Sequence, residues 1–193
     1  MTSAESRMWE SFKAGDRIAY KMIYEQYIHV LLNYGYKVTS DRDLLKDSVQ
    51  DLFMELWNSR GKLSSTTSIK FYLYKALRNK ICRNKSKSHE ADRLPLDTFM
   101  KILSNAASDD DQYEAETKTI QINHLKEVIE KLPARQREAI NLRYFHNFSY
   151  EEMAEIMGVN YHSVCKFIYA ALKNLKEYMK VAVAITLFFL ASI

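Results

Sequence analysis

Residues 149–175 read SYEEMAEIMGVNYHSVCKFIYAALKNL, a stretch that predicts two helices joined at a glycine. Ser149 and Glu152 are spaced as a capping box, in which each side chain accepts a hydrogen bond from a free backbone N–H at the helix start. Gly158 follows the apolar positions of this first helix, and glycine readily adopts the left-handed backbone that ends a helix. Asn160 can then cap the second helix.

The second helix has two different faces. Its apolar residues recur at helical period and form one stripe: Val164, Ile168, Ala171, Leu172 and Leu175. The opposite face carries His162, Ser163, Lys166, Tyr169, Ala170 and Lys173. A short helix, a tight turn and a second helix with a polar face are typical of a helix-turn-helix, whose second helix enters the major groove of DNA. An ordinary helical hairpin has the same stripes and remains the alternative.

Composition limits the fold class and the chemistry. The chain has 193 residues, enough for one large or two small domains, and its 4 Gly and 2 Pro leave few turns for a β-rich fold. We therefore predict an all-α protein. Cys82 and Cys165 lack metal-ligand spacing and no signal peptide is recognised, which favours reduced thiols in the cytoplasm. No phosphate loop, nucleophile elbow or metal-spaced His/Cys set is found, so we predict no enzyme, no catalytic residue, no metal and no cofactor.

The first half of the chain contains a dense apolar stretch and then a helix with an acidic face. Aromatic and aliphatic residues fill residues 16–38, as expected for a helical core. Residues 41–57 place one apolar stripe (Leu45, Val49, Leu52, Phe53 and Leu56) opposite a polar face (Asp43, Asp47, Gln50, Asp51 and Met54). An acidic helix face is commonly just solvated surface. The alternative is a docking face for a basic partner, selected by charge complementarity.

Charge then changes sign along the chain. Residues 60–89 contain nine basic side chains and no Asp or Glu, although the whole chain carries a net charge of only +4. Phe71, Tyr72 and Tyr74 lie among these cations, a mixture that suits single-stranded nucleic acid, with cations along phosphates and rings for base stacking. A basic helix whose aromatic residues are all in the core is the alternative.

An acidic segment separates the two halves. Residues 90–121 contain eight acidic side chains, one proline and the run SNAASDDD, which together predict a linker. Apolar residues between Leu94 and Leu103 are compatible with a short docked helix. The cluster at residues 109–111 is interpreted as solvated acid rather than a cation site. We predict a first domain at 1–90, a linker at 91–120, a second domain at 121–180 and an apolar tail at 181–193.

Taken together, the two halves of the chain resemble the extracytoplasmic-function group of sigma-70 family factors. These are small two-domain subunits that give bacterial RNA polymerase its promoter choice. Residues 47–57, DSVQDLFMELW, are similar to the DLVQEVFLRLW helix of the family. Residues 68–87, SIKFYLYKALRNKICRNKSK, resemble its FRAWLYRIARN-type helix. Residues 132–164 match the pattern LPxxxREvlxLRYfegLSYeEIAeilGis. The likeness covers about residues 10–90 and 121–178, which would be the region-2 helical bundle and the region-4 helix-turn-helix domain.

This resemblance implies roles for particular residues and partners. By the resemblance, the clamp helices of the largest polymerase subunit are contacted by Asp47, Gln50, Asp51 and Phe53. The minus-10 promoter element and its melted strand are contacted by Lys70, Tyr72, Arg78, Asn79, Lys80 and Arg83. The minus-35 element is contacted by Tyr161, His162, Ser163, Lys166, Tyr169 and Lys173. The resemblance also implies contact with the beta flap of the polymerase and control by a membrane-bound anti-sigma factor.

The chain departs from the family pattern at two places. Cys165, Lys166 and Phe167 stand where the family commonly has a basic run, so we expect weaker or more shape-dependent reading of DNA. Residues 181–193, VAVAITLFFLASI, carry no charge, and a helix of that length spans about 20 Å against about 30 Å of hydrocarbon. We favour docking of this tail on the protein itself or on a partner such as an anti-sigma factor. Shallow membrane association with help from Lys173, Lys176 and Lys180 is the less favoured alternative.

Two other function classes compete with a polymerase-binding initiation factor. A stand-alone helix-turn-helix regulator would need no polymerase-binding face and usually carries a ligand or receiver domain, which is not visible in the sequence. An interaction protein held permanently by a membrane anti-sigma factor is the other rival.

Overall fold

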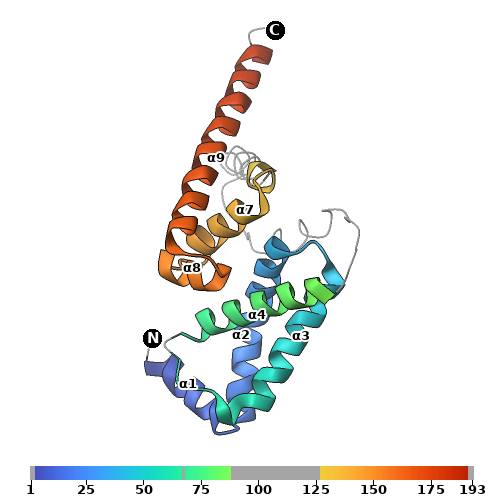
Figure 1. Ribbon diagram of the computed structural model, residues 1–193, viewed down its shortest axis with the longest axis vertical. Helices are drawn as coiled ribbons and strands as arrows, with labels where there is room; N and C mark the ends of the chain where they lie inside the picture. Colours follow the sequence, from blue (N-terminus) through green and yellow to red (C-terminus); the bar gives the residue numbers. More distant parts are fainter. Residues whose placement is uncertain (1–2, 67, 88–126, 191–193) are drawn as a thin grey trace, which may run out of the picture.

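The computed structural model describes residues 3–66, 68–87 and 127–190, and the regular structure within these ranges is helical (Figure 1). This agrees with the predicted all-α class. The acidic linker lies in residues 88–126, so its boundaries, the docked helix considered near Leu94 to Leu103 and the cluster at 109–111 fall outside the described residues.

The first domain consists of four α-helices and one short 3-10 turn. Asp16 caps the second helix by accepting a hydrogen bond from the backbone N–H of Ile18 at 2.8 Å. Asp41 caps the third helix, accepting from the N–H groups of Asp43 at 3.1 Å and Leu44 at 2.9 Å. The elements are α1 (Ser3–Lys13), α2 (Arg17–Val38), α3 (Arg42–Ser59), η1 (Arg60–Lys62) and α4 (Ile69–Lys87).

The core of this domain is rich in aromatic rings. Trp9 and Phe12 of α1 are buried with ring centroids 5.3 Å apart, and Phe12 stacks on Tyr20 of α2 at 5.9 Å. The Tyr20 hydroxyl donates to the carbonyl oxygen of Phe53 at 3.0 Å and so ties α2 to α3. The predicted apolar stripe of α3 is confirmed, since Leu45, Val49, Leu52, Phe53 and Leu56 are all buried.

The second domain contains the predicted helix-turn-helix. Pro133 precedes α7 (Ala134–Ile140), which continues as a π-helical turn, η4 (Asn141–Phe145). The capping box of α8 (Tyr150–Met157) is complete: Ser149 Oγ accepts from the N–H of Glu152 at 3.1 Å, and Glu152 Oε2 accepts from the N–H of Ser149 at 2.8 Å. Gly158 ends this helix at φ 62°, in the left-handed region.

The last helix, α9 (Tyr161–Leu190), begins as predicted but runs further than its domain. The N–H of Ser163 donates to Asn160 Oδ1 at 2.8 Å, which confirms the predicted cap. Val164, Ile168 and Ala171 are buried, whereas Leu172 is 44% exposed, so its expected place in the apolar stripe was wrong. Within the described residues, no helix is both long enough and apolar enough to cross a membrane.

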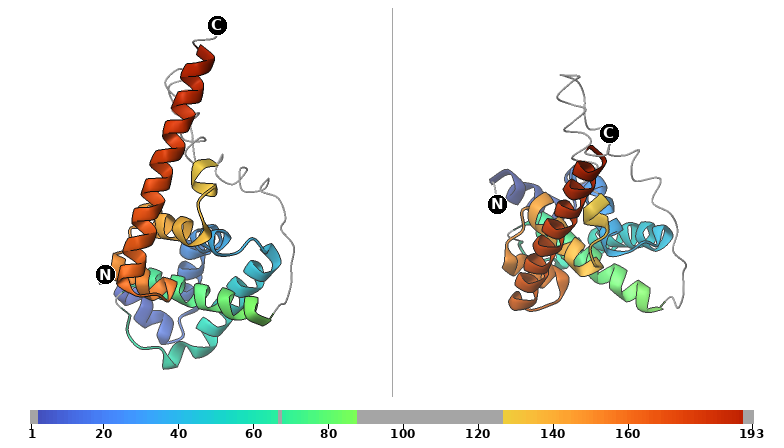
Figure 2. Two further views of the ribbon diagram at one scale, coloured as in Figure 1. Left: turned by 45° about the horizontal axis from the view of Figure 1, so that its top comes forward. Right: turned by 90° about the horizontal axis from the view of Figure 1, so that it is seen from above.

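The two domains pack directly against each other, an arrangement that the sequence did not predict. Helix α4 of the first domain contacts α8, and α2 contacts α7, while α9 covers α7 and α8 from the far side (Figures 1 and 2). Helix α4 therefore lies at the contact between the two domains.

Packing within the first domain yields a stability prediction at Gly35. A Cβ atom placed there would lie 2.2 Å from Leu45 Cδ1, and Leu45 is fully buried. We expect Gly35→Ala to lower the free energy of unfolding by about 1–2 kcal/mol, because overpacking outweighs the gain in helix propensity. A Cβ at Gly61 meets no atom within 4 Å, so Gly61→Ala should be neutral or slightly stabilising. Urea unfolding followed by circular dichroism compares the two, and equal effects would contradict the packing.

Candidate protein and nucleic-acid interfaces

The predicted acidic face of α3 is exposed. Asp43, Asp47, Gln50 and Asp51 point away from the core on successive turns, and Met54 continues the same face with 54% of its surface exposed. Phe53 does not share this exposure, because its ring is buried 4.8 Å from that of Tyr24 and 6.5 Å from that of Tyr20. The structure therefore places Phe53 beneath the face, where it supports α3 from the core.

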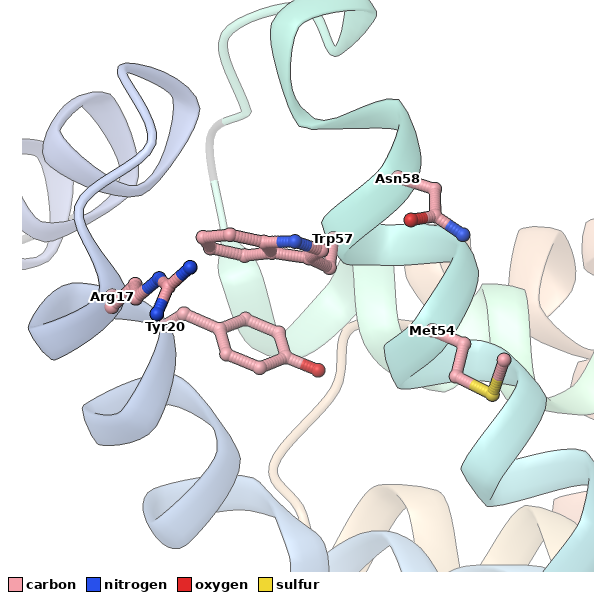
Figure 3. A pocket seen from close by; sticks show the side chains of 5 residues that line it. All are labelled: Arg17, Tyr20, Met54, Trp57 and Asn58. Atoms are coloured by element: carbon pink, nitrogen blue, oxygen red, sulfur yellow. The ribbon is translucent and has the colours of Figure 1, made fainter.

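An apolar hollow follows the acidic face. Tyr20, Met54 and Trp57 line it, with Arg17 at the α2 side and Asn58 at the α3 side (Figure 3). The Tyr20 and Trp57 rings are tilted with centroids 5.1 Å apart. Exposed Ile18 and Met22 lie on the neighbouring helix α2. An exposed group of large apolar side chains beside charged residues is the usual composition of a protein interface. The acidic stripe was predicted, but the α2 half of this surface was missed.

The six residues predicted to contact the minus-10 element do not share one environment. Asn79 and Arg83 are exposed, and Lys70 and Tyr72 are half-buried. Lys80 is buried, and its ammonium donates to Glu55 of α3 at 2.5 Å, within the first domain. Arg78 is buried as well, but its partner belongs to the second domain.

Arg78 and Glu138 form an ion pair between the domains. Arg78 is 5% exposed and Glu138 3% exposed, and Arg78 Nε donates to Glu138 Oε1 at 2.7 Å. The same carboxylate oxygen accepts from the hydroxyl of Tyr34 at 3.0 Å. A Cβ at Gly158 would lie only 3.6 Å from Arg78 Nη1, so the guanidinium also lies against the turn of the helix-turn-helix.

Burial and hydrogen bonding act in opposite directions on this pair. Burial raises the pKa of Glu138, while Arg78 and the Tyr34 hydroxyl lower it. For Arg78, burial lowers the pKa, but the carboxylate of Glu138 raises it by more than burial lowers it. The guanidinium therefore stays protonated. Glu138 was not among the predicted site residues, and its contact with Arg78 is a buried ion pair between the second domain and α4.

His146 forms a second polar contact beside the ion pair. The Tyr74 hydroxyl lies 3.0 Å from His146 Nδ1, and Lys70 Nζ donates to the backbone oxygen of His146 at 2.6 Å. The Lys70 ammonium also lies 5.0 Å from the centroid of the Phe148 ring, and the Tyr74 ring meets that ring edge-on at 5.1 Å. Burial, and then the charge of Lys70, lower the pKa of His146 to about 4, so the ring is neutral near pH 7.

Two ion pairs lie toward the edge of the domain contact. Lys75 of α4 pairs with Glu155 of α8 at 2.7 Å, with both side chains substantially exposed. Lys37 of α2 pairs with Glu130 at 2.5 Å, and Arg137 of α7 also contacts Glu130 at 2.7 Å. The domain contact thus has a buried polar centre and an ionic rim. One face of α4 is covered by the second domain.

The polar face of α9 remains open. Tyr161, His162, Lys166, Tyr169 and Lys173 are exposed, Tyr169 by 73%, and Ser163 is half-buried. All six predicted minus-35 residues lie on or beside this face. Phe167 packs partly against the core, which leaves Lys166 as the cation of the first turns. Among the described residues, no cluster of His, Cys, Asp and Glu has an arrangement that could hold a metal ion.

Comparison with protein-family models identifies both domains. The model of sigma-70 region 2 matches residues 23–90, and that of sigma-70 region 4 matches residues 123–175. Similar proteins include the RNA polymerase sigma factor YlaC of Bacillus subtilis, 25% identical over 157 residues, a match covering 81% of this chain and 90% of YlaC. The sigma factor SigM, classed as extracytoplasmic-function in the same organism, is 23% identical over 154 residues, covering 80% of this chain and 91% of SigM.

Solved structures show the same fold. The structure of CnrH in complex with the cytosolic domain of CnrY has a TM-score of 0.61 and 16% identity, and the match covers 93% of this chain and 99% of that one. The sigma factor RpoE of Bartonella quintana, in complex with the anti-sigma factor NepR, has a TM-score of 0.56 and 24% identity, covering 83% of this chain and 96% of RpoE. The structures show the fold alone, whereas the matches of both sigma-70 region models, with relatives that are extracytoplasmic-function sigma factors, show the family: the chain belongs to the extracytoplasmic-function group of the sigma-70 family of RNA polymerase sigma factors.

Proposed function

We propose that this chain joins core RNA polymerase, recognises the minus-10 and minus-35 elements of promoters and nucleates strand separation in the cytoplasm. The observation that carries the proposal is the presence, in one chain, of an exposed acidic face on α3 and an exposed polar recognition face on α9. The relatives named as RNA polymerase sigma factors support it. The chain would act through binding energy alone, without a catalytic residue or cofactor.

Transcription in vitro tests this function directly. Core polymerase with the full chain should give run-off transcripts from a cognate promoter, and core polymerase alone should not. A stand-alone helix-turn-helix regulator would bind the same DNA without forming a complex with core polymerase. Absence of both a transcript and a core complex would contradict the proposal.

The α3 face and the adjoining hollow have the chemistry of a polymerase-binding surface. Asp47 and Asp51 give one end of the surface negative charge, and Met54 begins its apolar end. A basic partner helix with an apolar anchor residue complements both ends. Charge at the rim governs how fast such partners associate, and the apolar hollow governs how slowly they separate.

Charge reversal on α3 should weaken core binding selectively. We expect Asp47→Lys with Asp51→Lys to reduce affinity for core polymerase on the order of tenfold or more, since attraction to a basic partner becomes repulsion. DNA binding through α9 should not change. Lys46→Glu is the control: Lys46 is exposed on the same helix, and this substitution makes the helix more negative, whereas the two Asp→Lys substitutions make it more positive. Equal losses in both variants, measured by interferometry, would contradict a charge-complementary face.

The proposed minus-10 contacts lie on a helix that the second domain partly covers. Arg78 is paired with Glu138, and the Lys70 ammonium is held by the backbone oxygen of His146. Phosphates and unpaired bases cannot reach these groups while the pairs persist. We therefore propose that the domains separate before α4 binds the melted strand, where base stacking and phosphate contacts replace the lost interdomain pairs.

Removing the charge of Glu138 should favour the separated form. Glu138→Gln leaves Arg78 without its buried carboxylate, which should increase the radius of gyration in X-ray scattering and tighten binding to non-template minus-10 DNA on the order of tenfold or more. Glu155→Gln makes the same substitution in the exposed pair with Lys75 and should change affinity less than about fivefold. An unaltered radius and unaltered DNA affinity in Glu138→Gln would show that the pair does not restrain the domains.

The domain contact should also respond to acid through His146. The pKa of His146 is about 4 in the contact and rises toward its ordinary value of 6.5 when the domains part. The contribution of the neutral ring to the contact is therefore complete above about pH 6.5 and is lost as pH falls toward 4. The raised pKa of Glu138 has the opposite effect, because acid favours burial of this carboxyl group and so strengthens the domain contact. A His146→Asn variant is therefore needed to separate the effect of the imidazole ring from that of Glu138. Scattering at pH 7.5 and 5 should show expansion of the wild type that is reduced in His146→Asn, and identical profiles would count against this role.

Control by an anti-sigma factor completes the proposal. The RpoE structure with the same fold contains an anti-sigma factor. For this chain we propose a membrane-bound anti-sigma factor that stabilises the closed arrangement of the domains. Purification of the closed chain with a bound protein that inhibits transcription would support this control.

A further inference from the structure

Helix α9 continues well past the domain that it belongs to. The family match ends at residue 175, whereas the helix runs to Leu190. Its contact with the domain weakens at the same point: Leu175 is partly buried, and Lys176, Glu177 and Tyr178 are all exposed although they face different directions. Both figures of the whole molecule show the end of α9 standing clear of the other described helices (Figures 1 and 2). None of the other described helices lies beside the last turns of α9 (Figures 1 and 2).

The sequence of these turns is apolar on every side of the helix. Residues 181–190, VAVAITLFFL, contain no charge. Ten consecutive uncharged residues make almost three turns of helix at 3.6 residues per turn, so no turn of this segment carries a charge. A helix that is apolar all round is either enclosed by protein or placed in lipid. A groove on a partner covers one side only, whereas acyl chains cover all sides.

Positive charge precedes the apolar segment. Lys173, Lys176 and Lys180 recur at i, i+3 and i+7, which places them on one stripe that leads to the apolar turns. Lys173 and Lys176 are exposed, and so is Tyr178, whose ring and hydroxyl suit the boundary between lipid and water. Lysines beside a membrane surface are attracted to anionic headgroups. Lys173 and Lys176 come first, then Tyr178 and Lys180, and the apolar turns follow, so basic and amphipathic side chains lie where the headgroup layer would be.

We infer that the last turns of α9 insert into one leaflet of an anionic lipid bilayer. Ten helical residues extend about 15 Å, roughly half of the ~30 Å hydrocarbon core, so the segment reaches one leaflet and does not span the membrane. Lys173 lies both on this basic stripe and on the proposed DNA face. Vesicles and DNA therefore compete for α9, and the membrane holds the second domain away from promoters.

Vesicle flotation of the full chain tests the insertion. The chain should float with vesicles of equal parts phosphatidylglycerol and phosphatidylcholine. Phe188→Asp should lower this partition on the order of 100-fold, because a charge replaces an apolar residue in the hydrocarbon. Leu172→Asp is the matched control, since Leu172 is an exposed apolar residue of the same helix within the domain, and it should float like the wild type. Lys176→Gln with Lys180→Gln should weaken binding to anionic vesicles on the order of tenfold.

A second measurement reports on depth. Phe188→Trp should be quenched by lipids brominated on their acyl chains, whereas the tryptophans of the parent chain, Trp9 and Trp57, should not respond in the same vesicles. Failure of the chain to float, equal flotation of Phe188→Asp, or absence of quenching would each overturn the inference. A dimer in sedimentation that disappears on removing residues 181–193 would also overturn it and would assign the tail to a second copy of the chain.

Discussion

A buried ion pair between Arg78 and Glu138 sets the arrangement of this molecule. Each charge has left water, and each is stable there only because the other, together with the Tyr34 hydroxyl, supplies its hydrogen bonds. Leaving one partner alone in the same place costs about 3–5 kcal/mol, so the contact tolerates little displacement. The ring of Tyr34, whose hydroxyl joins the pair, lies 4.8 Å from that of Tyr74, which in turn contacts the rings of His146 and Phe148.

The same pair divides the functional surfaces into open and closed ones. The acidic face of α3 and the polar face of α9 are exposed in the packed form, whereas Arg78 and the Lys70 ammonium on α4 are occupied by the second domain. The proposed function then implies an order of events. Polymerase would engage α3 while the domains remain together, and α4 would become available to single-stranded DNA only after they part. Binding energy from the polymerase and the promoter would offset the loss of the interdomain pairs.

Local features of the fold could be predicted from the sequence because their causes are local. The Ser149 capping box, the Gly158 turn and the apolar stripe of α3 each depend on residues within a few turns, and all were confirmed. The domain contact depends on residues far apart in sequence, so Arg78 was predicted as a DNA contact without its partner. The sequence offered one signal for the burial of Glu138, since this residue precedes buried Leu142 by one helical turn. The hollow at Trp57 required the crossing of α2 and α3, which no spacing in either helix encodes.

The separation of the domains is the step on which the proposed function of α4 rests. Cys82 of α4 and Cys165 of α9 provide one thiol in each domain, and spin labels on them report the distance between the domains by pulsed electron resonance. We predict a single narrow distance distribution in the free chain and a longer distance when the chain is bound to core polymerase and promoter DNA. An unchanged distance in the transcribing complex would contradict domain separation and, with it, the proposed role of Arg78 at the minus-10 element.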